Sequence, residues 1–170
     1  MFKSNPLKQV INFGPLILLY YLSFSEIDSY FETYFEILSF NIQLIIIYFW
    51  SLKRPDIIGN GHIFLAGLIN DVVMGIPLGL SPISYLIVSL VAAYIKNMTV
   101  NTRITTDWFT FFIAVFFSNL TLFILVSNFA DISMNITDLS YNTFFTLLFF
   151  PFFWFIFNLY NVLIVEGRNA

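Results

Sequence analysis

Six stretches of the chain are continuously apolar, and each is bounded by charged or turn-forming residues. A helix needs about 20 mainly apolar residues to cross the hydrocarbon core of a bilayer. The pattern therefore predicts an all-α integral membrane protein with six transmembrane helices and short loops. We expect residues 1–170 to form a single polytopic domain, with spans at about 10–25, 37–52, 57–76, 78–95, 108–126 and 143–165.

A β-barrel and a cleaved signal peptide both fit the apolar stretches less well than membrane-spanning helices do. Strands of a transmembrane β-barrel alternate apolar and polar residues, whereas the run from Leu44 to Trp50 is apolar throughout. Lys3 and Lys8 precede the first stretch, as basic residues do in a secretory signal peptide. Because five further apolar stretches follow, we interpret 10–25 as a retained first span.

Composition excludes several classes of protein. The chain is 59% apolar and 10% charged, with a mean hydropathy of +0.85, whereas soluble domains are about 45–50% apolar and about 25% charged. A soluble enzyme and a disordered chain are both excluded by this excess. The absence of cysteine and the single histidine, His62, exclude disulfides, thiolate zinc sites, iron–sulfur clusters and multi-histidine metal cages.

The charged residues predict the orientation of the spans. All seven basic residues fall on one side of the predicted membrane: Lys3, Lys8, Lys53, Arg54, Lys96, Arg103 and Arg168. The opposite side holds the acidic residues Glu26, Asp28, Glu32, Glu36, Asp131 and Asp138. Cytoplasmic loops are enriched in Lys and Arg, so we expect both termini in the cytoplasm and a bacterial inner membrane as the location.

The third span contains the strongest candidate for a functional site. On a helix, Gly67, Asp71 and Gly75 lie at i, i+4 and i+8 and share one face, with Asn70 on the adjacent stripe. Small and polar residues together are typical of a helix–helix contact. Asp71 is the only acidic residue within a predicted span, and such residues normally face the interior of a bundle.

No basic residue lies in any predicted span, so we expect no ion pair for Asp71. Either its carboxyl group is protonated by desolvation, or it accepts hydrogen bonds from free backbone N–H groups. We favour the second, because the break at Pro77 starts a new helix whose first N–H groups lie near residues 78–81. Gly75 and Gly79 are then turn residues. A structural role is favoured over a proton relay, which needs several ionisable groups in a row.

The segment from Ala66 to Leu80 resembles the signature of the rod shape-determining protein MreD family. The similar features are an apolar Gly-Leu stretch, an Asp, two apolar residues, a Gly two residues on, and Pro-Leu-Gly. The preceding Lys53-Arg54-Pro55-Asp56 and the following apolar span Ile83 to Lys96 resemble that family as well. The residue-level similarity covers about positions 53–96, and Asn70 departs from it because the family is usually apolar there.

This resemblance implies a non-enzymatic scaffold of the bacterial cell-elongation complex, which helps to organise lateral peptidoglycan synthesis and maintain rod shape. The implied partners are an MreC-like membrane protein and, through it, MreB, RodA and a class B penicillin-binding protein. It implies no cofactor, metal or nucleic acid. The implied fold is that of the substrate-binding subunits of energy-coupling-factor (ECF) transporters. The implied interaction motif consists of Gly67, Asp71, Gly75, Pro77 and Gly79.

A vitamin-binding subunit of an ECF transporter is the alternative, because such subunits are also small six-helix proteins. That function needs a pocket lined by polar residues, and the spans offer Asn41, Gln43, Ser118, Asn119, Thr121, Asn158 and Asn161. Other candidates are weaker. His62 is expected to be a hydrogen-bonded interfacial group, and Glu32 with Glu36 is expected to be a solvated acidic rim because two carboxylates alone bind cations weakly.

Overall fold

The computed structural model describes residues 6–25, 40–98, 103–129 and 136–169, and these residues form six helices. Side chains are described for all of these except 6–11, 129 and 164–169. The helices are α1 (Pro6–Phe24), α3 (Ile42–Lys53), α4 (Asn60–Met74), α5 (Leu80–Met98), α6 (Ile104–Phe129) and α7 (Ile136–Asn169). The predicted all-helical class is thus confirmed for the described part of the chain.

Local signals in the sequence explain several helix ends. The side chain of Asn41 caps α3 by accepting a hydrogen bond from the backbone N–H of Leu44 at 3.1 Å. The N–H of Asn41 itself donates to Thr146 Oγ1 at 2.8 Å, which fixes the start of α3 against α7. The next helix, α4, ends at Gly75, which adopts a left-handed conformation with φ of 65°.

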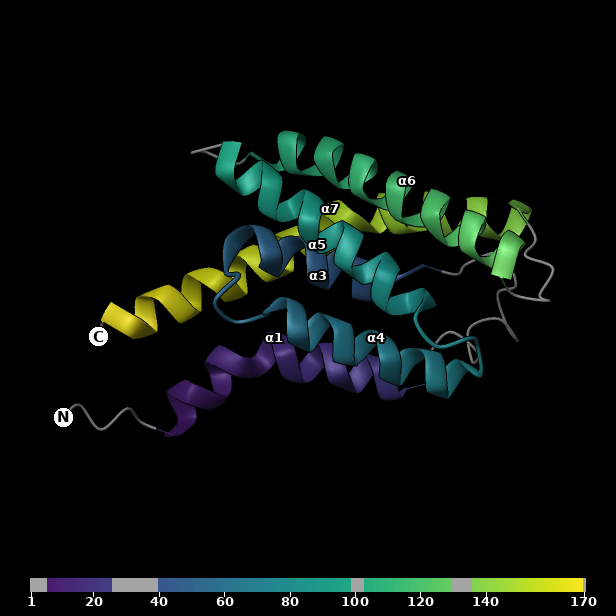
Figure 1. Cartoon of the computed structure of the whole chain (residues 1–170). Coiled ribbons are helices and arrows are strands. Elements are labelled where there is room, and N and C mark those ends of the chain that lie inside the picture. Colours follow the sequence, from purple (N-terminus) through teal and green to yellow (C-terminus); the bar gives the residue numbers. More distant parts are fainter. Residues whose placement is uncertain (1–5, 26–39, 99–102, 130–135, 170) are drawn as a thin grey trace.

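Five of the helices form a closed ring, and α3 lies inside it (Figure 1). Around the ring, α1 packs against α4, α4 against α5, α5 against α6, α6 against α7, and α7 against α1. The contact between α1 and α7 is close because Gly14 lies directly against the hydroxyl of Tyr160. Backbone packing joins α3 to α1, α5 and α7, and side-chain hydrogen bonds join it to α4 and α6.

The position of α3 differs from what the sequence predicted for the stretch 37–52. Every residue from Gln43 to Leu52 is buried, so this apolar helix faces other helices on all sides and not lipid. Its 12 residues span about 18 Å at 1.5 Å per residue, which is less than the hydrocarbon core of about 30 Å. A helix that is apolar all round is expected inside a bundle, and aromatic pairs such as Phe49–Phe157 and Tyr48–Phe111 surround it.

Among the described helices, α5, α6 and α7 are each long and apolar enough to cross a membrane, whereas α1 and α3 provide shorter apolar segments. This supports a membrane protein in the coarse sense. The ends also differ from the predicted spans. The third stretch is shortened to 15 residues by Gly59 and Gly75, α6 begins at Ile104 before the predicted 108, and α7 extends the predicted 143–165 to 136–169.

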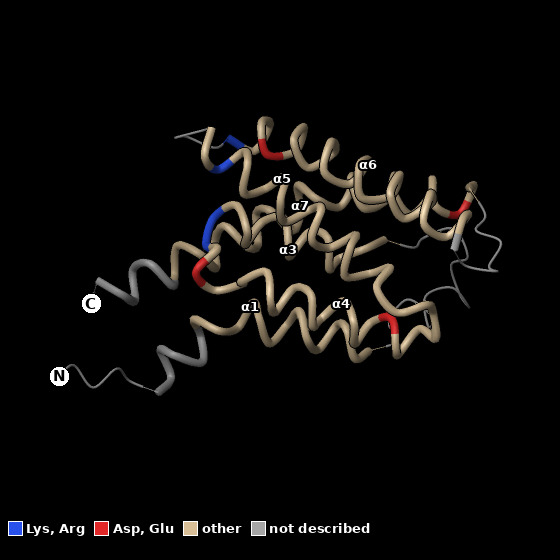
Figure 2. Tube along the Cα trace, in the orientation of Figure 1, with Lys and Arg blue, Asp and Glu red and all other residues tan. Residues whose placement is uncertain are grey.

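Charges separate towards the two ends of the bundle (Figure 2). In the described part of the chain, the basic residues lie at the end of the bundle where α1 begins: Lys53 and Arg54 at the end of α3, Lys96 in the last turn of α5 and Arg103 just before α6. Asp71, near the end of α4, and Asp138, in the first turn of α7, lie at the opposite end. Asp56 and Asp107 lie at the basic end, beside Arg54 and Lys53. The other charges used to predict orientation lie outside the described residues or on side chains that are not described: Lys3, Lys8, Glu26, Asp28, Glu32, Glu36, Asp131 and Arg168.

Single cysteines test the predicted orientation, since the chain has none of its own. Leu78 at the acidic end and Met98 at the basic end are equally exposed, at 68% and 67%. An impermeant thiol reagent added to intact spheroplasts should label the Leu78→Cys variant and spare the Met98→Cys variant, because the enrichment in Lys and Arg predicts that the basic end is cytoplasmic. Permeabilised cells, in which both should be labelled, are the control. Labelling of Met98→Cys alone in intact spheroplasts would reverse the topology.

Candidate functional site

Asp71 connects the end of α4 to the start of α5. Its fully buried carboxylate accepts hydrogen bonds from the backbone N–H of Gly79 at 2.6 Å and from that of Ser81 at 2.9 Å. Each carboxylate oxygen therefore has one N–H donor at the N-terminus of α5, where the helix dipole also favours negative charge. These are the backbone hydrogen bonds that the sequence predicted, and the donors lie in the predicted region.

Gly75 and Gly79 shape the turn that brings these donors to Asp71. Their φ values are 65° and 106°, in the region that disfavours residues with a Cβ atom. After α4, the N–H of Ile76 donates to the carbonyl of Asp71 at 3.1 Å and that of Gly75 to the carbonyl of Val72 at 3.4 Å, which is a Schellman ending. The two glycines are confirmed as turn residues, and Pro77 is exposed between them.

Gly67 allows α4 to approach the first turn of α5. A Cβ atom at this position would lie 2.6 Å from the backbone N of Pro82 and 2.7 Å from its Cα. Backbone atoms cannot move aside as a flexible side chain can, so only glycine fits this contact. Gly67 and Asp71 are therefore both buried against α5, whereas Gly75 continues the same stripe into the turn.

Beside the carboxylate, a chain of hydrogen bonds joins α3, α4 and α5. Tyr85 Oη donates to Gln43 Oε1 at 2.5 Å, Gln43 Nε2 donates to Asn70 Oδ1 at 3.1 Å, and Asn70 Nδ2 donates to Ser81 Oγ at 3.0 Å. All four side chains are buried, so each bond is made where an unpaired group would be costly. The sequence identifies Asn70 and Gln43 as polar span residues but does not indicate Tyr85 or Ser81.

The chemistry available at this site is limited. Both oxygens of Asp71 are engaged by backbone donors, and the surrounding groups are amides and hydroxyls without a general base or an activated nucleophile. Among the residues that the structure describes, no group of three or more His, Asp or Glu side chains could hold a metal ion. The arrangement is suited to fixing one helix against the next.

A second buried carboxylate was missed by the sequence prediction. Asp107 is fully buried in the first turn of α6, and its Oδ2 accepts a hydrogen bond from Trp154 Nε1 at 2.9 Å and lies 3.4 Å from Lys53 Nζ. The expectation that Asp71 is the only acidic residue in a span was therefore wrong, because α6 starts earlier than predicted. Lys53 ends α3, so this contact fixes the end of α3 opposite to Gln43.

The remaining sequence candidates lie apart from one another. Nδ1 of His62 lies 3.1 Å from Tyr20 Oη, between α4 and α1, and this agrees with an interfacial hydrogen-bonded group. In the loop between α3 and α4, Arg54 donates hydrogen bonds to both carboxylate oxygens of Asp56, each at 3.2 Å. These bonds hold the pKa of this exposed carboxyl group below its ordinary value. Such exposed pairs add little stability. Glu32 and Glu36 are outside the described residues.

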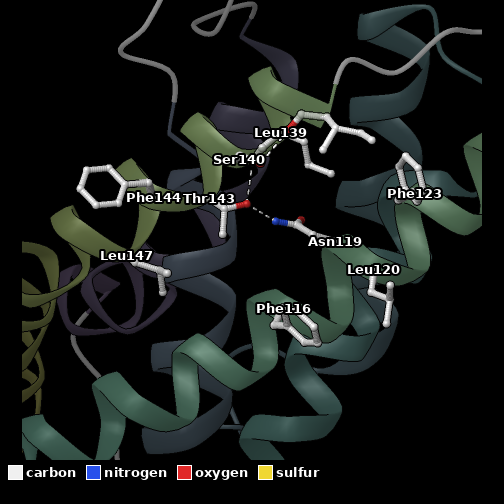
Figure 3. Close-up of a pocket in the computed structure, with 10 residues that line it drawn as sticks. Phe116, Asn119, Leu120, Phe123, Leu139, Ser140, Thr143, Phe144 and Leu147 are labelled. Carbon is white, nitrogen blue, oxygen red and sulfur yellow. Dashed lines mark hydrogen bonds between the residues drawn. The ribbon is translucent and has the colours of Figure 1, made fainter.

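The polar span residues do not converge on one pocket. Ser118 pairs with Ser84 at 2.5 Å and Asn119 with Thr143 at 2.6 Å, while Thr121 donates to the carbonyl of its own helix at Phe117. Asn158 and Asn161 lie elsewhere, on α7. A cavity of about 420 Å³ does exist between α6 and α7, but its lining is mainly apolar (Figure 3).

The chain matches no protein-family model, no curated protein and no solved structure. The expected relation to the MreD family therefore rests on the sequence of residues 53–96, and the ECF-like fold is an implication of that resemblance.

Substitutions at Asp71 separate a structural role from proton or ion handling. Asp71→Asn retains one acceptor but places its amide NH₂ against the second backbone N–H, and Asp71→Leu removes both acceptors. If the role is structural, thermal stability in detergent and membrane abundance should fall in the order Asp, Asn, Leu. Each unsatisfied buried donor should cost about 1–3 kcal/mol.

The same variants are then tested for complementation of a deletion strain, and their abundance in the membrane is measured in the same cells. Loss of function by Asp71→Asn at normal abundance and stability would contradict the structural role. It would favour a role for the charge itself.

Proposed function

We propose that this protein is a six-helix membrane scaffold subunit of the bacterial cell-elongation complex, located in the inner membrane with both termini in the cytoplasm. In this role it helps to organise lateral peptidoglycan synthesis and maintain rod shape, without catalysis and without a cofactor. Its partner is an MreC-like membrane protein, through which it is linked to MreB, RodA and a class B penicillin-binding protein.

The proposal is supported most by the contacts that the MreD-like residues make in the structure. Asp71, Gly75 and Gly79 form a closed hydrogen-bonded turn between α4 and α5, and Gly67 permits the close packing of the same two helices. The residues that resemble the family signature are thus engaged in holding a helical hairpin. A protein that works by presenting rigid helices to partners needs this kind of site.

The ECF-type alternative has less support from the arrangement of polar groups. A vitamin pocket needs several convergent hydrogen-bonding side chains in a concave site. In the described part of the chain, Gln43, Asn70 and Tyr85 bond to one another, and Ser84 bonds to Ser118. These side chains are used in joining helices.

Depletion in the rod-shaped host tests the proposal. Depleted cells should lose their uniform width and become round over a few generations, and re-expression of the unsubstituted chain should restore rods. Uptake of labelled vitamins, measured in the same cells, should be unchanged. Depleted cells that keep their shape but lose uptake of one vitamin would contradict the scaffold function and favour the transporter alternative.

A further inference from the structure

A groove between α6 and α7 lies outside the site formed by Asp71 and the turn between α4 and α5. Its volume is about 420 Å³, and apolar side chains that include Phe116, Leu120, Phe144 and Leu147 form most of its walls (Figure 3). Phe116, Leu120 and Phe144 are also exposed on the outside of the bundle. The groove therefore opens on the surface that faces the lipid when these helices span a membrane.

A polar pair interrupts this apolar lining. Asn119 Nδ2 donates to Thr143 Oγ1 at 2.6 Å, and the hydroxyl of Thr143 donates in turn to the carbonyl of Leu139 at 2.7 Å. The one O–H of Thr143 is therefore used. Asn119 still has one N–H and its Oδ1 without a partner among the described residues, as Figure 3 shows for the groove.

The depth of Asn119 makes these unused groups significant. α6 runs from Ile104 to Phe129, so Asn119 lies about 22 Å from its first residue and about 15 Å from its last, at 1.5 Å per residue. When α6 is centred in a membrane, this places the amide within a hydrocarbon core of about 30 Å, toward the acidic end. Its partner Thr143 lies about 10 Å along α7 from Ile136, the first residue of that helix. Water is absent at that depth, and an unpaired amide is unfavourable there.

The chemistry of the groove indicates what fills it. An acyl chain would cover Phe116, Leu120 and Phe144 but cannot form a hydrogen bond with Asn119. A helix with Ser, Thr, Asn or Gln at the depth of Asn119 can cover these apolar side chains and also hydrogen-bond to Asn119. Such polar side chains join helices in membranes. We infer that the groove between α6 and α7 binds one transmembrane helix of a partner protein, and that a Ser, Thr, Asn or Gln side chain of this helix hydrogen-bonds to Asn119.

A second copy of this chain fits the groove less well. Two-fold related copies place the same surface patch on both sides of the interface. Two concave grooves facing each other would leave a gap, whereas a single convex helix fills one groove. The inference deepens the proposed scaffold function and rests on it in one respect, namely that the occupant is a helix of an assembly partner.

Photo-cross-linking in living cells tests this inference. p-Benzoylphenylalanine is placed at Phe116 or Phe144 in the groove, and at Phe109 or Phe155 as controls, which are similarly exposed on the same two helices but do not line the groove. After irradiation, the adducts are mapped at the peptide level. Groove positions should cross-link to a transmembrane segment of one other protein that has a Ser, Thr, Asn or Gln at the depth of Asn119, and control positions should not.

Substitution of Asn119 then tests the hydrogen bond. Asn119→Leu keeps a similar volume without polar atoms and should lower the cross-linking yield at least about threefold, the effect of losing one interhelical hydrogen bond in a membrane. Thr121→Val is the matched control on the same helix, because the hydroxyl of Thr121 bonds to its own backbone, and it should leave the yield unchanged. If Asn119→Leu does not accumulate, the comparison of groove and control positions in the unsubstituted chain is decisive.

Several results would overturn the inference. These are adducts with lipid only, adducts with a second copy of this chain, and equal yields at groove and control positions. The proposed function fails separately. If the captured helix belongs to no protein of cell elongation and depleted cells stay rod-shaped, the scaffold function in elongation is wrong while the groove assignment stands. If depleted cells become round but the groove positions form adducts with lipid only, the groove assignment is wrong while the scaffold function in elongation stands.

Discussion

A short helix that is apolar on every side is stable inside a bundle only if its neighbours cover its whole circumference, and α3 places this requirement on the other described helices. Its residues from Gln43 to Leu52 are all buried, and the ring of α1, α4, α5, α6 and α7 provides the cover. Lipid is as apolar as these side chains, so buried residues such as Trp50 and Phe49 stabilise the bundle through close van der Waals packing with neighbouring helices. Much of the apolar surface of the described helices is used inside the bundle, and the rest faces outwards on the surrounding helices α1, α4, α5, α6 and α7.

Hydrophobic burial alone does not fix how α3 is rotated or how far it is inserted, and polar contacts at its two ends do so. At one end Gln43 bonds to Asn70 and Tyr85, beside the contact of Asp71 with the start of α5. At the other end Lys53 lies against Asp107 and Trp154. Such groups are costly to bury unless they are paired, so only the arrangement that pairs them is favourable. The contact with α3 is thus made by Asn70, and Asp71 beside it fixes α4 against α5.

The sequence predicted the features that depend on nearby residues. Pro77 and the two glycines indicated a turn, and the spacing from Asp71 to the next helix indicated backbone donors for its carboxylate. The features it missed depend on distant residues. Apolar side chains on all sides of 42–53 cannot distinguish a helix in lipid from a helix in a core, because both surroundings are apolar. Asp107 fell just outside the predicted span 108–126, because its partners Lys53 and Trp154 lie on two other helices that are distant in the sequence.

The enclosure of α3 is the central claim, and tryptophan fluorescence tests it directly in bilayers that contain lipids with brominated acyl chains. Trp50 on α3 is 1% exposed and Trp108 on α6 is 47% exposed, and both lie toward the basic end of the bundle. Bromine quenches tryptophans that contact lipid, and the variants Trp50→Phe and Trp108→Phe both retain Trp154. Our account predicts that Trp108→Phe removes most of the quenching and that Trp50→Phe leaves it nearly unchanged. Loss of quenching in Trp50→Phe instead would show that α3 faces lipid and would contradict the account.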